Sequence, residues 1–259
     1  MTKRIVGFAR PFRLANIFER REAERAEAIL LRQTEELLRQ KEVLLQEMQH
    51  RVANSLHIIA SILLLKARSV SSEETQLHLV DAHRRIMAVA AVQEQLHGAR
   101  QGDQVEMRPY LSKLCESLAS SLTGDTRPVT LRPLVDDGTV LSTTAVSIGL
   151  VVAELFINAL KHAFPGDRND CQVTVSFDVN GSDWKLVVSD NGIGKAIGTT
   201  ATTGGGLGSS LIKALAHQLD AKVDIVSSPK GRSVAVTHAT SISPLIESVD
   251  GAHHVGSPA

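Results

Sequence analysis

The sequence predicts a multi-domain protein in which an all-α helical hairpin precedes an α+β sandwich. Three observations predict this order: residues 14–68 contain neither Gly nor Pro, a second helix-like segment stops near Gly98, and short alternating segments begin after Arg108. A chain of 259 residues is long enough for about two domains, and its 43% of hydrophobic residues can fill their cores.

The first segment is expected to form one long helix over residues 14–68. Leucine or alanine recurs along it at seven-residue intervals, at Ala23, Leu30, Leu37 and Leu44. The intervening heptad positions include the polar residues Thr34 and Lys41, so the pattern predicts a weak coiled coil rather than a strong zipper. The charged run over residues 19–27 is expected to be a solvated face of this helix.

A second helix is expected after a short polar break at residues 69–72. Ser71 or Ser72 can cap it, because the two glutamates that follow then occupy the first turn, where the helix dipole favours acids. The helix reaches about His97, and the two helices form an antiparallel hairpin. One hairpin buries two apolar stripes poorly, whereas two copies can form a four-helix bundle. The sequence therefore predicts a homodimer.

The second half of the chain mixes helical and alternating segments without strict alternation, which favours an α+β sandwich. We expect helices over residues 109–122, 142–163 and 206–219. We expect strands over residues 127–134, 171–180, 183–190, 221–227 and 231–238. Asn180-Gly181 predicts a hairpin turn, and the tail from Ala239 is expected to be loosely ordered.

Composition argues against several classes of function. Lys+Arg and Asp+Glu both number 28, so the balanced charge gives no basis for nucleic-acid binding. Cys115 and Cys171 lack the spacing of a metal site or a disulfide framework and fit a reducing cytoplasm. Polar residues interrupt the longest apolar segment, residues 140–160, and the N-terminal apolar stretch is too short for a signal peptide. We therefore expect no membrane span in this chain.

His50 is a candidate nucleophile on the first helix. The expected buried stripe of this helix spans about 60° of arc on an ideal helix and consists of Val52, Leu56, Ile59 and Leu63. His50 lies on the opposite side, with Asn54 one turn later on its own face and Arg51 beside it as a phosphate partner. An exposed imidazole can attack phosphorus. Taken alone, however, an exposed helical histidine is usually only a surface residue.

Three segments of the second half point to nucleotide chemistry, and the first is the helix over residues 142–163. Glu154, Asn158 and Lys161 share one polar face of this helix, and His162 follows. An Asn side-chain oxygen suits Mg²⁺, and a lysine suits phosphate as a point charge. The alternative for this segment alone is an ordinary amphipathic helix.

The second segment is the turn Asp190-Asn-Gly192-Ile-Gly194, which follows an expected strand. An aspartate at a strand end can accept a hydrogen bond from an adenine amino group, and the two glycines let the backbone approach a ligand closely. Taken alone, an Asp-Asn-Gly sequence is more often a simple turn.

The third segment is a glycine-rich loop that opens the last expected helix, with Gly204, Gly206 and Gly208. Free N–H groups at a helix start attract phosphate. A flexible linker has a similar composition. The loop is neither a Walker motif, because no Gly-Lys-Ser/Thr follows, nor a Rossmann fingerprint, because no strand leads into it.

In this order and spacing, the three segments resemble the N, G1 and G2 boxes of the GHKL (Bergerat-type) ATP-binding fold. Together with the upstream Gln49-His-Arg-Val-Ala-Asn54, they resemble the histidine kinases, and among these the HisKA type 2 group, which is related to the HWE kinases. The stretch from Glu154 to Pro165 is especially similar to that group. The resemblance covers about residues 41–238.

The resemblance implies roles for the residues around the acceptor and the metal. His50 would be the phosphoacceptor, with Asn54 beside it and Glu154 assisting as a base. Asn158 would hold Mg²⁺. Two further side chains would lie near the phosphates of ATP, those of Lys161 and His162.

The resemblance also implies roles for the two glycine-rich segments. Asp190 would recognise adenine, and Gly192 and Gly194 would shape the adenine pocket. Residues 195–205 would form a short lid. The phosphate-side loop would consist of Gly204, Gly206 and Gly208.

The implied activity is autophosphorylation of His50 with ATP and Mg²⁺, followed by transfer to an aspartate of a response-regulator receiver domain. The implied organisation is a signalling or coiled-coil helix over 1–40, a dimerisation and histidine phosphotransfer domain over 41–100, a mobile linker near 99–107, a catalytic domain over 107–238 and a tail over 239–259. A cytoplasmic homodimer is expected. The residues before the first helix are too few for a sensory domain, so the chain is a fragment or an upstream sensor protein supplies the signal.

The sequence departs from the family pattern at three places. The Trp-x-Glu element of the HWE kinases is absent from the turn at Asp190, which favours the sister group. Ser55 follows Asn54 where the family commonly has Asn, and the aromatic-rich lid box of other kinases is missing.

Three alternatives to the kinase remain at this point. A phosphotransfer adaptor would keep the bundle and lose the ATP pocket. A GHKL serine kinase that acts on an anti-sigma partner would lack the upstream histidine hairpin. A scaffold would only dimerise.

Overall fold

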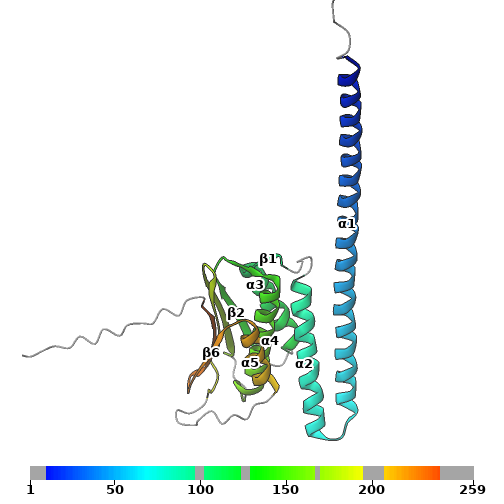
Figure 1. The fold of residues 1–259 in the computed structure, drawn as a ribbon. Coiled ribbons are helices and arrows are strands. Elements are labelled where there is room, and N and C mark those ends of the chain that lie inside the picture. Colours follow the sequence, from blue (N-terminus) through cyan, green and yellow to red (C-terminus); the bar gives the residue numbers. More distant parts are fainter. Residues whose placement is uncertain (1–9, 97–101, 124–128, 167–169, 195–206, 240–259) are drawn as a thin grey trace, which may run out of the picture. The chain divides into compact units, whose positions relative to one another are not determined.

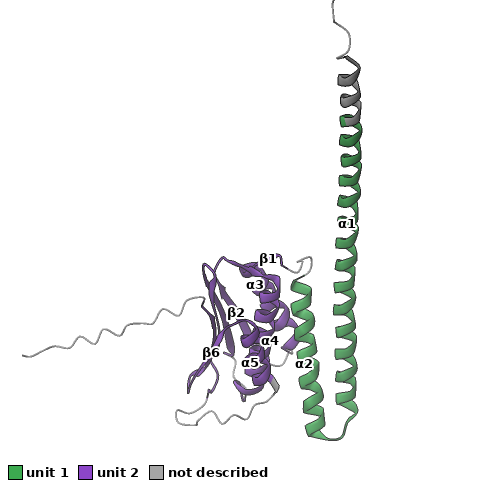
Figure 2. Ribbon diagram, in the orientation of Figure 1, with its two compact units in different colours: residues 1–100 green, residues 101–259 purple. Residues whose placement is uncertain are grey.

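The computed structural model describes residues 10–96, 102–123, 129–166, 170–194 and 207–239. The chain divides into two compact units, residues 1–100 and residues 101–259 (Figure 2). The expected lid at 195–205 and most of the tail lie outside the described residues, as do residues 99–101 of the expected linker.

The first unit is a helical hairpin of α1 (Arg10–Ser69) and α2 (Glu73–Gln95) (Figure 1). Ser72 is the N-cap of α2, and its hydroxyl oxygen accepts a hydrogen bond from the backbone nitrogen of Thr75 at 3.3 Å. Glu73 and Glu74 occupy the first turn of α2. The expected hairpin is confirmed, and Ser72 rather than Ser71 supplies the cap.

Small side chains form the buried face of α1, which corrects the expected stripe. Ala53, Ala60 and Ala67 are buried at seven-residue intervals, whereas Val52 remains 49% exposed and Ile59 46% exposed. α1 packs on α2 within the hairpin, and alanines let two helices approach closely. Of the four expected residues, Leu56 and Leu63 are half-buried, while Val52 and Ile59 lie on the exposed flank of the hairpin.

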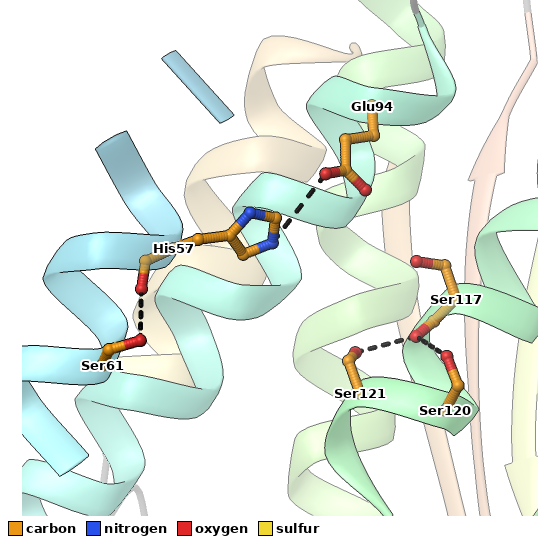
Figure 3. A network of polar contacts seen from close by, with 6 residues as sticks. All are labelled: His57, Ser61, Glu94, Ser117, Ser120 and Ser121. Atoms are coloured by element: carbon orange, nitrogen blue, oxygen red, sulfur yellow. Dashed lines mark hydrogen bonds and ion pairs between the residues drawn. The ribbon is translucent and has the colours of Figure 1, made fainter. Parts of the chain in front are cut away.

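Two polar contacts join the helices of the hairpin. The ring nitrogen Nδ1 of His83 lies 2.9 Å from the carbonyl oxygen of Ala60. The Nε2 atom of His57 lies 3.8 Å from Oε1 of Glu94, an ion pair when the ring is protonated (Figure 3). Both contacts fix the register of α1 against α2.

The second unit contains a five-stranded sheet with the order β2-β4-β5-β7-β6. Its strands are β2 (Thr130–Val135), β4 (Gln172–Asn180), β5 (Asp183–Asp190), β6 (Lys222–Ser228) and β7 (Gly231–His238). β2 is parallel to β4, and the other neighbouring pairs are antiparallel. The expected hairpin between β4 and β5 forms, with Gly181 at a φ of 63°.

Three helices cover one face of this sheet (Figure 1). They are α3 (Met107–Leu122), α4 (Ser142–His162) and α5 (Leu207–Gln218). The side chains of β4 alternate accordingly: Val173, Val175 and Phe177 are fully buried, while the residues between them are partly exposed. The α+β sandwich is therefore confirmed, with its core between this face and the helices.

α4 is the central core helix of the unit. By length and composition this helix could cross a membrane, which the interrupted apolar segment did not lead us to expect, but 67% of its most apolar stretch is buried inside the structure. Phe156 and Ile148 are fully buried, and Lys161 and His162 occupy the last turn, where basic side chains suit the helix dipole.

A small antiparallel sheet of β1 (Gln104–Glu106) and β3 (Thr139–Leu141) was not expected from the sequence. The backbone nitrogen of Met107 donates to the carbonyl of Gly138 at 2.9 Å and extends this pairing into α3. The second unit thus begins before residue 107, and residues 104–107 of the expected linker are ordered structure. Three-residue strands are too short to show an alternating pattern.

Candidate functional site

The second unit contains a cavity of about 320 Å³ between α4 and one end of the sheet. Most of its walls are apolar, formed by Leu155, Ala159, Ala163, Val173, Val188, Ile193 and Val234. The polar groups in the lining come from Asn158, His162, Asp190, Ser227 and Arg232. Apolar walls with a few polar groups are typical of a site for a flat organic ring.

Asp190 lies at this end of the sheet because it is the last residue of β5. In the strand register it is opposite Val173 of β4, and Val188, two residues earlier on the same face, is opposite Val234 of β7. The carboxylate therefore borders a floor made of three valines.

Two backbone N–H groups hold the carboxylate of Asp190 in place. The nitrogen of Gly192 donates to Oδ1 at 2.9 Å, and the nitrogen of Arg232 donates to the same oxygen at 3.3 Å. Oδ2 is therefore the oxygen that can accept a hydrogen bond from a ligand amino group.

The glycines after Asp190 are required by close backbone contacts. A Cβ atom on Gly192 would lie 2.3 Å from the carbonyl oxygen of Ala163, and one on Gly194 would lie 1.8 Å from the carbonyl oxygen of Ser228. Gly194 also has a φ of 54°. The loop after β5 thus passes tightly between the end of α4 and the β6–β7 turn, which only glycine permits.

Asn191 has a structural part in this turn. Its side-chain oxygen accepts from the nitrogen of Gln172 at 2.9 Å, and its side-chain nitrogen donates to the carbonyl of Asp170 at 2.6 Å. These bonds tie the end of β5 to the start of β4.

The expected polar face of α4 divides into three environments. Asn158 and His162 line the cavity, whereas Glu154 is 3% exposed and Lys161 is exposed at the helix end, and neither of these two lines the cavity. The side-chain oxygen of Asn158 is one hard ligand for Mg²⁺. Such an ion takes few protein ligands when substrate phosphates supply others. Among the described residues, no group of three His, Cys, Asp or Glu could hold a metal by itself.

The glycine-rich loop is described only from its last part. Gly204 and Gly206 lie outside the described residues. Gly208 is buried and is the second residue of α5.

In the other unit, His50 and Asn54 are both exposed on α1, as their positions on the helix predict. Arg51, expected beside a phosphate, instead forms an ion pair with Glu47, with Nη2 and Oε1 2.5 Å apart. The two residues are one helical turn apart on a solvated face, where such pairs form readily.

Sequence reasoning missed two polar residues of the cavity, Arg232 and Ser227. They are cross-strand partners on β7 and β6. Strand alternation could have found Arg232, because it precedes the buried residues Val234 and Val236 by two and four positions and so lies on their face.

Comparisons with known proteins agree with this arrangement. The family described as "Histidine kinase" (HisKA_2) matches residues 47–122, and the family described as "Histidine kinase-, DNA gyrase B-, and HSP90-like ATPase" matches residues 143–241. The first match contains His50 and Asn54, and the second contains the whole cavity lining.

Curated relatives carry similar names. The chain is 26% identical over 183 residues to the sensor histidine kinase PdtaS of Mycolicibacterium smegmatis, covering 70% of this chain and 36% of that protein. It is 28% identical over 166 residues to PdtaS of Mycobacterium tuberculosis, covering 64% of this chain and 33% of that protein. The chain thus spans about a third of the length of these relatives.

A solved structure supports the fold. The histidine kinase domain from the Erythrobacter litoralis EL346 blue-light activated histidine kinase aligns with a TM-score of 0.52 and 22% identity, covering 71% of this chain and 94% of that one. At this identity the likeness is one of fold.

Proposed function

The chain belongs to the histidine kinases of the HisKA type 2 group with a GHKL ATPase domain, and from this premise we propose that it is an ATP-dependent autokinase. It phosphorylates His50 and passes the phosphoryl group to an aspartate of a response-regulator receiver domain. The observation that carries the proposal is the presence, on one chain, of an exposed helical histidine and a cavity in which Asp190 borders apolar walls.

In the proposed complex, the purine of ATP lies between the apolar walls of the cavity, and Oδ2 of Asp190 accepts a hydrogen bond from its amino group. Gly192 and Gly194 keep this pocket open. Lys161 and His162 are proposed to lie near the phosphates, together with Gly204, Gly206 and Gly208. The side-chain oxygen of Asn158 would hold Mg²⁺, which neutralises phosphate charge when bound.

The proposed chemistry has two balanced steps. A ring nitrogen of His50 bonds to the γ-phosphorus while the bond from that phosphorus to the β–γ bridging oxygen breaks, and ADP leaves with the electron pair. Asn54 orients the ring, and Glu154 is proposed as the base that accepts the proton from the other ring nitrogen. In the second step a carboxylate oxygen of the receiver aspartate bonds to phosphorus, the nitrogen–phosphorus bond breaks, and the electron pair returns to the ring of His50, which regains a proton.

The proposed assembly is a homodimer built from two hairpins. The apolar flank of α1, defined here as Leu45, Met48, Val52, Ile59 and Ile62, is exposed in the single chain. Exposed apolar residues in a continuous stripe are typical of an interface, and a second copy of the same hairpin can cover them as a four-helix bundle.

Two further parts of the proposal concern the cellular compartment and the upstream signal. Cys115 and Cys171 are both buried and neither forms a disulfide, which suits a reducing compartment, and we place the protein in the cytoplasm. An upstream sensor would act through α1, the long helix that carries His50.

Incubation of the full chain with γ-labelled ATP and Mg²⁺ tests the activity. We expect acid-labile label on the wild type and none on His50→Ala. A matched control is His78→Ala, which removes another exposed helical histidine and should keep full labelling. Wild-type labelling of His50→Ala would reject the acceptor.

Two variants separate nucleotide binding from chemistry. Asp190→Asn should lose ATP binding and labelling together, because an amide whose oxygen keeps the two backbone N–H bonds presents an NH2 donor, not an acceptor, to the amino group of adenine. Glu154→Gln should lose labelling while it keeps ATP binding. A wild-type chain that binds no ATP would instead support the phosphotransfer adaptor.

A further inference from the structure

Arg232 places a permanent cation in the lining of an otherwise mainly apolar cavity. The residue is half-buried near the start of β7, and no part of the proposed mechanism uses its side chain. A guanidinium group keeps its charge at any physiological pH, so its desolvation by a bound ligand needs a compensating acceptor or an aromatic face.

The sheet register brings Arg232 next to Asp190. Ser189 pairs with Ser233 across β5 and β7, so the following residue of β5 and the preceding residue of β7 are neighbours on one face. Ser227 of β6 is directly opposite Arg232 on its other side. At this end of the sheet, three neighbouring strands thus place Asp190, Arg232 and Ser227 in one row.

The charge of Arg232 is not used to neutralise Asp190. The contact between the two residues runs from the backbone nitrogen of Arg232 to Oδ1, at 3.3 Å. In the part of the chain that the structure describes, the guanidinium forms no ion pair with a carboxylate. Both residues line the cavity, so a carboxylate acceptor and a side chain with N–H donors lie beside each other at its edge.

This pair matches one edge of adenine. The exocyclic amino group is a donor, and the ring nitrogens on either side of it, N1 and N7, are acceptors. A carboxylate alone can recognise only the amino group, which is the donor. A guanidinium beside it can donate to the neighbouring nitrogen, and such a charge-assisted bond is stronger than a neutral one.

From this geometry we infer that Arg232 is a specificity-determining residue of the nucleotide site. Its guanidinium donates a hydrogen bond to a ring nitrogen that flanks the amino group, N1 or N7, while Oδ2 of Asp190 accepts from the amino group. The inference rests on the proposed ATP-binding function and adds the residue that recognises the purine ring itself.

The base is a better partner for Arg232 than the phosphates. The side chain shares its face with Val234 and Val236, and the backbone of Arg232 holds the carboxylate of Asp190. The groups proposed to lie near phosphate come instead from the end of α4 and from the glycine-rich segment over residues 204–208.

Calorimetric titration of the full chain with ATP, 1-deaza-ATP and 7-deaza-ATP tests the inference. Arg232→Met keeps an unbranched chain in place of the aliphatic part of arginine, keeps the backbone bond to Asp190 and removes the guanidinium donors. We expect it to bind ATP about tenfold more weakly than the wild type, as the loss of one charge-assisted hydrogen bond predicts.

The two analogues identify which ring nitrogen of adenine, N1 or N7, accepts the hydrogen bond from Arg232. One of the two should bind the wild type about tenfold more weakly than ATP, and Arg232→Met should bind that analogue and ATP equally well. Adenosine, which has no phosphate, should show the same loss in Arg232→Met. The matched control is Lys230→Met, which removes an exposed cation two residues away and should leave every affinity unchanged.

Several outcomes would overturn the inference. Both analogues could bind the wild type as tightly as ATP, or Arg232→Met could bind ATP normally. A loss seen with ATP but not with adenosine would assign the cation to the phosphates. If the wild type still binds ATP and labels His50 in any of these cases, the result rejects only the role of Arg232. If the wild type binds no ATP, the result also rejects the proposed function.

Discussion

The two units of this chain bury very different side chains. In the sheet unit the large apolar residues Phe156 and Phe177 are fully buried. In the hairpin the fully or nearly fully buried residues are mostly alanines, while Ile58 is 62% exposed and Ile62 is 53% exposed. The sheet unit therefore completes its core within one chain, and the hairpin does not.

This difference separates two sources of stability. A core closed within one chain gives a free energy of unfolding that does not depend on protein concentration. A hairpin that leaves its large apolar residues on the surface gains most of its stability from whatever covers them, and its stability then varies with concentration. The single tryptophan, Trp184, is buried in the sheet unit, so its fluorescence reports on that unit alone.

The largest expected effect is on the core of the sheet unit. Phe156→Ala should lower the free energy of unfolding by about 3–5 kcal/mol, because it leaves a cavity beneath α4. Denaturant unfolding followed by Trp184 fluorescence measures this loss, which should be the same at low and high protein concentration. Leu134→Ala, at an exposed site, is the control. A loss that changed with concentration would contradict a core closed within one chain.

The next effect concerns the flank of α1. Ile59→Asp should raise the dissociation constant of the dimer at least about tenfold, because burial of an isoleucine contributes about 1.5–3 kcal/mol and is replaced by burial of a charge. Light scattering across a dilution series measures it. Ser61→Asp changes an exposed polar residue of the same helix and should leave the dimer intact. An unchanged constant in Ile59→Asp would remove this flank from the interface.

A smaller effect depends on pH and again falls on the sheet unit. Burial, and then the charge of Glu116, raises the pKa of Cys115 from 9.0 to about 12. Burial likewise raises the pKa of Tyr110, whose hydroxyl donates to the carbonyl of Ala145 at 3.0 Å. Because the folded thiol holds its proton more tightly than the unfolded one, its stabilising contribution is complete below pH 9 and is lost as the pH rises towards 12.

Trp184 fluorescence in denaturant at pH 8 and pH 10 checks this dependence. The wild type should lose about 1 kcal/mol more than Cys115→Ala between the two values. Equal losses in the two proteins would show that the thiol does not titrate differently on unfolding.

The smallest expected effect is at the turn of the hairpin. Ser72→Ala removes the bond to the nitrogen of Thr75 and should lower helix stability by about 1 kcal/mol. Thermal unfolding followed by circular dichroism measures it at a fixed protein concentration. Ser71→Ala is the neighbouring control and should unfold at the same temperature as the wild type. A lower stability of Ser71→Ala than of Ser72→Ala would assign the cap to Ser71.

Local pattern alone determined most of the elements. The uninterrupted helix before residue 69, the core helix α4 and the β4–β5 hairpin follow from periodicity, from the absence of helix breakers and from Asn180-Gly181, all of which act over a few residues. The exposure of His50 and the position of Asp190 at a strand end are equally local. The sequence determined these features because their causes lie within one or two turns of chain.

Only the tertiary structure decided which elements became neighbours. Alternation assigns Arg232 to the inner face of its strand, but a strand pairing across more than 40 residues brings it beside Asp190. Likewise, periodicity predicts an apolar stripe on α1, while the close packing of α2 selects the alanines for the contact and leaves Ile59 on the flank. Periodicity fixes the side to which a residue points; the partner on that side depends on contacts between distant segments, which no local pattern encodes.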